Sequence, residues 1–300
     1  MTLVVVRSDE VNDALQDGRP VVALESTIFS TLGLPSPHNA VALERCVATI
    51  RGEGAIPAVT CVIEGVARVG VTPAEHERVL RGAAKVAERD LAIAVAQRWA
   101  VGVTTVSASL ALAHATGIEV FATGGIGGVH RGAELTGDVS ADLGALAAHP
   151  VVCVSAGAKA FLDLARTLEE LERLGVPVVG FGTDEFPAFY TRSSGLPVPH
   201  RVDDPGTVAA IFTNRARACA GLLVANPIPA ADELAASELD DALRNANAEA
   251  ASAGVSGAAL TPYVLERIGE ATAGRSVPAN LALAEANARL AARIAVALAG

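Results

Sequence analysis

The chain of 300 residues can form one large or two small domains, and its hydrophobic share of 51% is sufficient for a sizeable buried core. Charged residues make up only 19% and aromatic residues 3%, which excludes a disordered chain and indicates a core of alanine, valine and leucine. The formal net charge of −10 argues against a partner with a nucleic-acid backbone, although it leaves room for one local basic pocket that binds a phosphate.

Short apolar runs rich in β-branched residues alternate along the chain with longer segments of helical periodicity. The apolar runs predict buried strands at 21–24, 58–63, 119–122, 151–154, 176–179 and 222–225. The periodic segments predict helices that include 39–51 and 160–174. This alternation, with strands that are apolar almost throughout, predicts an α/β fold: a three-layer α/β/α sandwich with a mainly parallel central sheet, in a single domain over 1–300.

Two helix starts carry capping signals. Thr72 and Pro73 supply a cap and a proline at the first helical position, and Glu75 completes a capping box. Thr261 and Pro262 repeat the cap and proline before a helix predicted over 263–271. From residue 230 onward the chain is rich in alanine and almost all of it is predicted to be helical.

Four cysteines lie far apart and form no CxxC pair, which favours buried thiols in a reducing compartment over disulfides or a metal site: Cys46, Cys61, Cys153 and Cys219. We expect no targeting segment and no membrane span, because no apolar run reaches ~18 residues. A cytoplasmic protein is therefore predicted. Its mean hydropathy of +0.41 suggests buried contacts between subunits.

The segment 123–132 (TGGIGGVHRG) is rich in glycine and follows a predicted strand. It does not fit a dinucleotide-binding loop, because a GxGxxG frame that starts at Gly125 places His130 where the third glycine belongs. The sequence also lacks a GxxxxGK[ST] loop, a GxSxG turn and an HExxH motif. What remains is a turn whose backbone N–H groups can bind an anion beside a histidine and an arginine, or a turn with a structural role alone.

Lysine is almost absent: of the 23 basic residues, only Lys85 and Lys159 are lysines. A lysine amine can lose its proton and become a nucleophile, whereas arginine stays protonated. Lys159 follows a predicted strand and a turn of small residues and is predicted to open a helix, a setting that suits a Schiff-base lysine. For Lys85, a lysine without a specific function is an equally good interpretation.

Three acidic residues are candidates for chemistry. Glu25 ends an apolar strand, where a carboxyl group is either a general acid or a carboxylate satisfied by the following backbone amides. Asp138 and Asp142 flank Ser140 at a predicted junction between a loop and a helix. This set suits a hard divalent cation such as magnesium or manganese, and equally a helix cap with an aspartate in the first turn.

Taken together, these residues resemble the pseudouridine-5′-phosphate glycosidase family, also called the indigoidine synthase A-like family. The resemblance covers nearly the whole chain from Val21 to the last predicted helix. It rests, in this order, on VVALESTIFS, KVAERDL, VTTVSASLALAHATGIEVFATGGIGGVHRGAELTGDVSADL, VSAGAKAFLDL, GVPVVGFGT, GLLVANPIP and LTPYVL.

The resemblance implies an enzyme that reversibly cleaves the C–C glycosidic bond of pseudouridine 5′-phosphate to uracil and ribose 5-phosphate. Such a carbon–carbon glycosidase is classed as a hydro-lyase, acts in nucleotide catabolism and uses a divalent metal, usually Mn²⁺. The implied route opens the ribose ring, attaches a lysine to C1′ and forms an iminium while the uracil carbon is protonated. The resemblance also implies small-molecule partners only and a homotrimer.

Residue roles carried over from the family fall on matching positions of this sequence. Lys159 would be the nucleophile, Glu25 the proton donor and Asp138 the metal ligand, with water as most of the remaining ligands. Residues implied to bind substrate are Lys85, on the phosphate side, and Val106, Thr123, His130, Ser140, Ala141, Asp142 and Asn280.

Two segments depart from the family pattern: Ser30–Gly33, which lacks a histidine found in many relatives, and an extra residue around 97–100 beside Trp99. Two rival hypotheses remain. One is a related C–N glycosidase or phosphosugar aldolase that uses the same lysine. The other is a non-catalytic regulator that binds a phosphosugar, against which the presence of both Lys159 and Glu25 argues.

Overall fold

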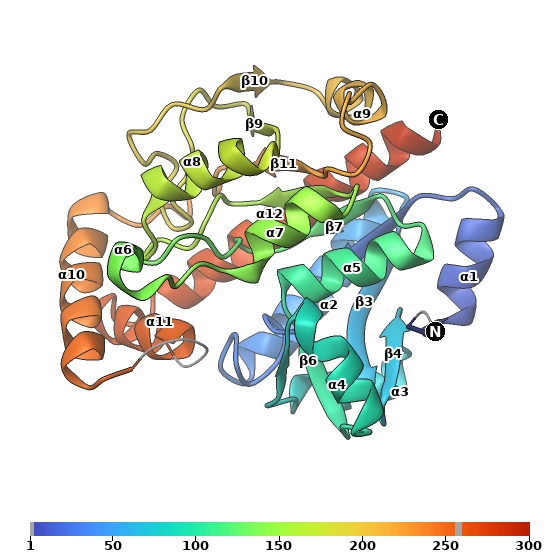
Figure 1. Ribbon diagram of the computed structural model, residues 1–300, viewed down its shortest axis with the longest axis horizontal. Coiled ribbons are helices and arrows are strands. Elements are labelled where there is room, and N and C mark those ends of the chain that lie inside the picture. The colour runs from blue at the N-terminus through green and yellow to red at the C-terminus, as the bar shows by residue number, and fades with distance from the viewer. Residues whose placement is uncertain (1–2, 256–259) are drawn as a thin grey trace.

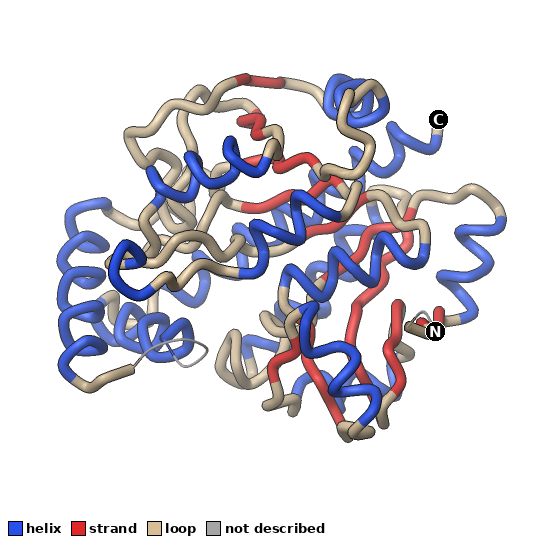
Figure 2. Tube along the Cα trace, in the orientation of Figure 1, coloured by secondary structure: helices blue, strands red, loops and turns tan. Residues whose placement is uncertain are grey.

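The computed structural model describes residues 3–255 and 260–300, and its centre is a mainly parallel sheet (Figures 1 and 2). The sheet order is β1-β4-β3-β2-β7-β8-β11-β9-β10, with β6 pairing both β3 and β5. The strands are β1 (Val5–Arg7), β2 (Val21–Leu24), β3 (Ile56–Ile63), β4 (Val66–Val69), β5 (Lys85–Val86), β6 (Val101–Thr104), β7 (Val120–Ala122), β8 (Val152–Ser155), β9 (Val178–Phe181), β10 (His200–Val202) and β11 (Leu222–Ala225).

Helices cover both faces of the sheet, so the predicted α/β fold is confirmed (Figure 1). They are α1 (Asp9–Gln16), α2 (His38–Gly52), α3 (Pro73–Leu80), the 3₁₀ turn η1 (Glu88–Asp90), α4 (Leu91–Ala96), α5 (Val106–Thr116), α6 (Ala133–Thr136), α7 (Ala141–Ala148), α8 (Leu164–Leu174), α9 (Pro205–Thr213), α10 (Ala236–Ser252), α11 (Leu260–Ala271) and α12 (Ser276–Ala299). The helices α5, α7 and α8 lie on one face, while α12 packs on the other with α2 and α9 beside it.

The path of the chain changes direction between β2 and β7, which are parallel neighbours. From β2 the chain crosses through α2 to β3, and from β7 it crosses through α7 to β8 on the opposite side. Because both crossovers are right-handed by rule, their helices cover opposite faces of the sheet. A crevice therefore opens outside the carboxyl ends of β2 and β7, the place where open α/β sheets bind ligands.

All six predicted strands are present, with bounds that agree within two residues. Five short strands were not predicted, and the sheet is not parallel throughout, since β3 runs antiparallel to both β4 and β6. The predicted capping box is confirmed, because the Glu75 carboxylate accepts hydrogen bonds from the backbone N–H and the hydroxyl of Thr72, both at 2.9 Å.

Three local predictions are wrong. Lys159 does not open a helix: α8 begins at Leu164, where the carboxylate of Asp163 accepts from the Arg166 N–H and caps the helix. Thr261 does not precede its helix, because α11 already includes it. Cys219 is exposed, whereas Cys46, Cys61 and Cys153 are buried free thiols as expected; burial raises the pKa of Cys61 to about 12.

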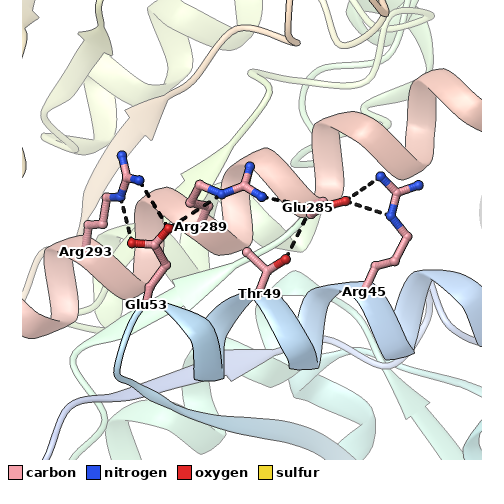
Figure 3. Close-up of polar contacts among 6 residues, drawn as sticks. All are labelled: Arg45, Thr49, Glu53, Glu285, Arg289 and Arg293. Atoms are coloured by element: carbon pink, nitrogen blue, oxygen red, sulfur yellow. Dashed lines mark hydrogen bonds and ion pairs between the residues drawn. The ribbon is translucent and has the colours of Figure 1, made fainter.

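The long helix α12 is fixed to α2 by a ladder of alternating charges on the surface (Figure 3). Glu285 accepts from Arg45 Nε at 2.7 Å and from Arg289 Nη2 at 2.8 Å. Glu53 accepts from Arg293 Nε at 2.9 Å. The inner face of the same helix packs on β7 and β8, so the ladder helps to set where the inward side chains of α12 lie. Within the described residues, no helix combines the length and apolar character that a membrane crossing requires.

Candidate active site

A cavity of about 240 Å³ opens at the carboxyl ends of β2 and β7, in the crevice that the topology creates. Its wall combines residues from several parts of the chain: the ends of β2 and β7, the strand β5, the start of α5, the segment before α7, the turn after β8 and the helices α11 and α12. It contains every site residue predicted from the sequence except Thr123, namely Glu25, Lys85, Val106, His130, Asp138, Ser140, Ala141, Asp142, Lys159 and Asn280.

Glu25 follows β2 directly and is buried, with 8% of its surface exposed. The hydroxyl of Thr123, which follows β7, donates a hydrogen bond to the Glu25 carboxyl group. Among the described residues no backbone N–H donates to that carboxyl group, so the alternative of a carboxylate satisfied by the following amides is wrong. Burial raises the pKa of Glu25, against the opposing charge of Lys159 and the Thr123 hydrogen bond, which favours a carboxyl group that keeps its proton.

Both lysines of the chain reach the same cavity. Lys159 lies in the turn after β8, where its backbone N–H donates to the Ile126 carbonyl at 3.1 Å. Lys85 lies on β5, which pairs with β6. Burial and the neighbouring charge of Lys159 lower the pKa of Lys85, so each amine faces a second cation inside one partly buried pocket.

The aspartate of the Ser140-Ala141-Asp142 segment holds two loops together. Asp142 is 5% exposed; its Oδ1 accepts from the Ser107 N–H at 3.0 Å and its Oδ2 from the Gly127 N–H at 2.8 Å. Ser140 caps α7 by accepting from the Asp142 N–H at 3.2 Å. Ser140 is thus the helix cap and Asp142 the first-turn aspartate, which is one of the two interpretations that the sequence allowed. The Asp142 carboxylate also joins the start of α5 to the glycine-rich turn.

Two further residues of this region form a weak pair. His130 Nδ1 lies 3.9 Å from Asp138 Oδ2, and the His130 N–H donates to the Asp138 carbonyl at 3.0 Å. Burial lowers the pKa of His130, and the charge of Asp138 opposes this shift. No hydrogen bond to the Asp138 carboxylate is present among the described residues, so its oxygens remain available to a ligand from the cavity.

Asn280 enters the cavity from α12, and its amide is unusual. The residue is 6% exposed, and its buried Oδ1 has no hydrogen-bond partner in the described structure. A buried carbonyl oxygen without a donor is costly, which suggests that a ligand supplies the missing N–H or O–H. Val106 begins α5, whose first-turn N–H groups and dipole favour an anion at that end of the cavity.

Sequence reasoning missed several parts of the wall. Arg89, Ser107, Phe189 and Leu265 also line the cavity; Arg89, Ser107 and Leu265 lie in stretches that carry the family resemblance, but no chemical pattern of their own distinguishes them there. Asn287 on α12 lies behind the wall, fully buried, and donates to the carbonyls of residues 123 and 124 at 2.8 and 3.2 Å. A buried amide on an alanine-rich helix is the one signal that could have drawn attention to it.

The two segments that depart from the family pattern differ in their positions. Leu32 and Gly33 line the cavity, and the Gly33 backbone approaches Ile28 so closely that a Cβ would lie 2.5 Å from the Ile28 Cα. This close approach requires glycine. Trp99 instead donates through Nε1 to Gln97 at 2.9 Å, between α4 and β6, and does not line the cavity.

Comparisons with known proteins agree over the full length of the chain. A family model described as indigoidine synthase A-like protein matches residues 10–297. Pseudouridine-5′-phosphate glycosidases of Methylobacterium nodulans and Nocardioides sp. are each 50% identical to this chain; the matches cover 97% and 98% of it and 87% and 96% of the relatives.

Two solved structures share the fold. An indigoidine synthase A-like protein from Thermotoga maritima has a TM-score of 0.89 and 37% identity, covering 99% of this chain and 97% of its own. The prealnumycin C-glycosynthase AlnA, solved with ribulose 5-phosphate, has a TM-score of 0.90 and 35% identity, covering 100% and 98%. The chain is therefore an enzyme and belongs to the indigoidine synthase A-like family, the pseudouridine-5′-phosphate glycosidase family that its sequence resembles.

Proposed function

We propose that the chain is a pseudouridine-5′-phosphate glycosidase, which reversibly cleaves the C–C bond between C1′ of the ribose and C5 of uracil. One observation carries this proposal: the cavity unites both lysines of the chain with a buried carboxyl group of raised pKa. The names of the relatives support it, and AlnA binds a pentose phosphate in a fold of the same kind.

In the proposed reaction, Lys159 acts as the nucleophile. An ordinary glycosidase expels an oxygen or nitrogen leaving group, whereas a C-nucleoside has only carbon to expel, so a pair of carboxylates is insufficient. The ribose ring opens when the C1′–O4′ bond breaks: N1 of the base loses a proton, O4′ gains one, and a double bond forms between C1′ and C5. The Lys159 amine then adds to C1′ and loses a proton, while the electron pair returns to the base, which regains its proton at N1. The bond from C1′ to uracil C5 then breaks, the base carbon takes up a proton, and the nitrogen lone pair forms an iminium. Water hydrolyses the iminium and releases ribose 5-phosphate.

Glu25 supplies the proton to the uracil carbon. Its burial favours the protonated form, and the Thr123 hydrogen bond orients one of its oxygens. In the synthetic direction the same group accepts the proton from uracil C5. The nearby charge of Lys159 then stabilises the resulting carboxylate.

The phosphate and the base occupy opposite ends of the cavity in this proposal. Lys85, the start of α5 at Val106, and the segment 140–142 form the phosphate end, where cations and helix N–H groups collect. Asn280 lies at the base end, where its buried Oδ1 accepts from an N–H of uracil. His130 lies beside Asp138 and near the sugar.

Asp138 is the residue that would hold a divalent metal. Among the described residues no group of three possible protein ligands surrounds a common point, so water would provide most of the ligands. This donor set fits magnesium or manganese, which keep several waters and need few carboxylates. When bound, the metal would supply positive charge beside the substrate oxygens.

An absorbance assay of uracil release from pseudouridine 5′-phosphate tests the proposed function. We expect EDTA to abolish turnover and Mn²⁺ to restore it, and Asp138→Asn to weaken metal affinity by about tenfold or more. Uridine 5′-phosphate, assayed in parallel, separates the rival C–N glycosidase. Release of uracil from uridine 5′-phosphate alone would overturn the proposal, and full activity after EDTA treatment would remove the metal from it.

We further propose that the enzyme assembles as a homotrimer, as its sequence resemblance implies. Exposed apolar side chains such as Leu135, at 89% exposure, and Val139, at the edge of the cavity, are candidates for contacts between subunits. Light scattering coupled to size exclusion gives the subunit number directly. The cytoplasmic location predicted from the sequence is a separate prediction, which cell fractionation checks.

A further inference from the structure

The phosphate of the proposed substrate brings nearly two negative charges into the cavity, because the second pKa of a phosphate monoester is about 6. Lys85 supplies one positive charge at the phosphate end. Lys159 cannot supply the second throughout the reaction, since its amine must lose its proton before it attacks C1′. The Asp142 carboxylate, which lines the same cavity, adds a negative charge. The balance of charge therefore calls for a further cation at the phosphate end.

Among the described residues, the cavity wall contains one arginine, Arg89, which lies in the 3₁₀ turn η1. The turn follows β5, the strand of Lys85, and Ala87 between the two cations also lines the cavity. The short stretch 85–89 thus forms one continuous part of the wall. The Arg89 side chain is 73% exposed. An arginine that lines a cavity and remains largely in solvent lies at the mouth of that cavity, where it can reach a ligand that enters.

Two hydrogen bonds fix the turn of Arg89 to the start of α5. The Thr105 N–H donates to the Val86 carbonyl at 2.9 Å, just before the turn. Within the turn, the Glu88 N–H donates to the Ser107 hydroxyl at 3.3 Å. Ser107 belongs to the first turn of α5, which the proposed function assigns to the phosphate. The backbone of Arg89 is therefore held beside the phosphate end of the cavity.

The acidic neighbours of Arg89 are engaged elsewhere. The Glu88 carboxylate pairs with His149 Nε2 at 2.8 Å. Asp90 Oδ2 accepts from the Ala87 N–H at 3.0 Å, and Asp90 Oδ1 lies 3.7 Å from Arg89 Nε, too far for a hydrogen bond. No hydrogen bond from the Arg89 guanidinium is present in the described structure. Its N–H donors are therefore available to an anion at the mouth of the cavity.

We propose that Arg89 binds the phosphate of the substrate at the mouth of the cavity, as the second cation beside Lys85. This inference rests on the proposed function and adds one residue to those that recognise its substrate. A guanidinium presents parallel N–H groups that match two oxygens of a phosphate. Because the whole chain carries a net charge of −10, an exposed cation at the mouth also reduces the repulsion of an incoming dianion.

Calorimetric titration with ribose 5-phosphate tests this inference, because it measures binding without uracil release. We expect Arg89→Ala to raise the Kd for ribose 5-phosphate about tenfold at low salt, as for the loss of one charge-assisted contact. The difference should shrink at high salt, since salt screens an exposed guanidinium. Arg89→Lys keeps the charge and should lose less affinity. In Arg89→Ala, kcat/KM should fall about tenfold for pseudouridine 5′-phosphate and less than about twofold for unphosphorylated pseudouridine.

Arg81→Ala is the matched control, because Arg81 follows α3 shortly before β5, is also largely exposed and does not line the cavity. Its Kd for ribose 5-phosphate should stay within about twofold of the wild type. An unchanged Kd in Arg89→Ala would overturn the inference, and so would an equal loss in Arg81→Ala, which would indicate an effect of net charge alone. Equal losses on phosphorylated and unphosphorylated pseudouridine would also overturn it. A wild type that releases no uracil would instead remove the proposed function, whereas the titration would still decide the role of Arg89.

Discussion

The protonation state of a titratable group in the site depends on its immediate neighbours. Glu25 is the clearest case: burial favours its protonated form, whereas the Thr123 hydroxyl and Lys159 favour the carboxylate. Because the first effect dominates, the pKa of Glu25 is raised, and the group can keep a proton at a pH where an exposed glutamate has lost it. In the cleavage direction the loss of this proton donor should therefore reduce the rate once pH rises through the raised pKa of Glu25.

Replacement of the hydroxyl that contacts Glu25 tests this balance. Thr123→Val removes a hydrogen bond that lowers the pKa of Glu25, with little change in volume, so that pKa should rise further. The descending limb of the cleavage rate should move to higher pH, as measured by kcat across a pH series. Thr123→Ser keeps the hydroxyl and should leave the limb near its wild-type position. A limb that moved to lower pH in Thr123→Val would contradict the assignment of Glu25 as the acid.

Phosphate recognition is also a prediction about one residue. Lys85→Ala should lower kcat/KM for pseudouridine 5′-phosphate about tenfold more than for unphosphorylated pseudouridine, because only the first loses a charge-assisted contact. Lys85→Arg keeps the positive charge and should retain more of the preference for the phosphorylated substrate. Equal losses on both substrates in Lys85→Ala would show that this lysine does not bind the phosphate.

At the scale of an element, α12 links the surface to the site. Outward, Glu285 belongs to the charge ladder with α2; inward, Asn287 donates to the main chain of the glycine-rich turn and accepts from Asn226 Nδ2 at 3.0 Å. The two faces differ in exposure, since the Glu285 side chain is 18% exposed and Asn287 is fully buried. We therefore expect very different energetic contributions from two polar residues on one helix.

Urea unfolding at pH 7 measures this difference. Asn287→Ala leaves the buried Thr123 carbonyl and the Asn226 amide without a partner, whereas the Gly124 carbonyl keeps the Ala156 N–H, so it should lower the free energy of unfolding by about 2–3 kcal/mol. Glu285→Gln weakens a surface network and should lower it by about 1 kcal/mol or less.

The loss of stability in Glu285→Gln should also depend on pH. Burial acts to raise the pKa of Glu285, but Arg45 and Arg289 outweigh it and the pKa is lowered. The stabilisation is therefore present above the unfolded pKa and is lost as pH falls through the folded one. A larger loss in Glu285→Gln than in Asn287→Ala would contradict this account.

At the scale of the whole molecule, the central strands could be predicted from the sequence and the edges could not. β2, β8 and β11 are buried throughout and appear as continuous apolar runs. β5, with two residues, and β10, mostly exposed, are too short or too polar to show a periodic pattern. The antiparallel pairing of β3 with β4 and β6 depends on contacts between distant segments, which no local pattern records.

The residues of the site also divide into those that the sequence predicts and those that it does not. Lys85 and Lys159 could be found because lysine is rare in this chain, and Glu25 because it is a charged residue at the end of an apolar strand. Asn287 could not, because its importance comes from hydrogen bonds to the carbonyls of residues 123 and 124, far away in the sequence. Residue chemistry is local in the sequence, whereas the shape and support of the cavity are properties of the fold.

The covalent role of Lys159 is the central claim, and trapping with borohydride tests it most directly. Incubation with ribose 5-phosphate and borohydride should reduce the iminium to a stable secondary amine, and mass spectrometry of the digest should place the added sugar phosphate on the peptide that contains Ala156-Gly157-Ala158-Lys159. Lys159→Arg, which keeps the charge, should fold normally, form no adduct and lose about 10³-fold or more in rate. An adduct on Lys85 would reverse the roles of the two lysines, and an active Lys159→Arg enzyme without any adduct in the wild type would contradict the covalent route.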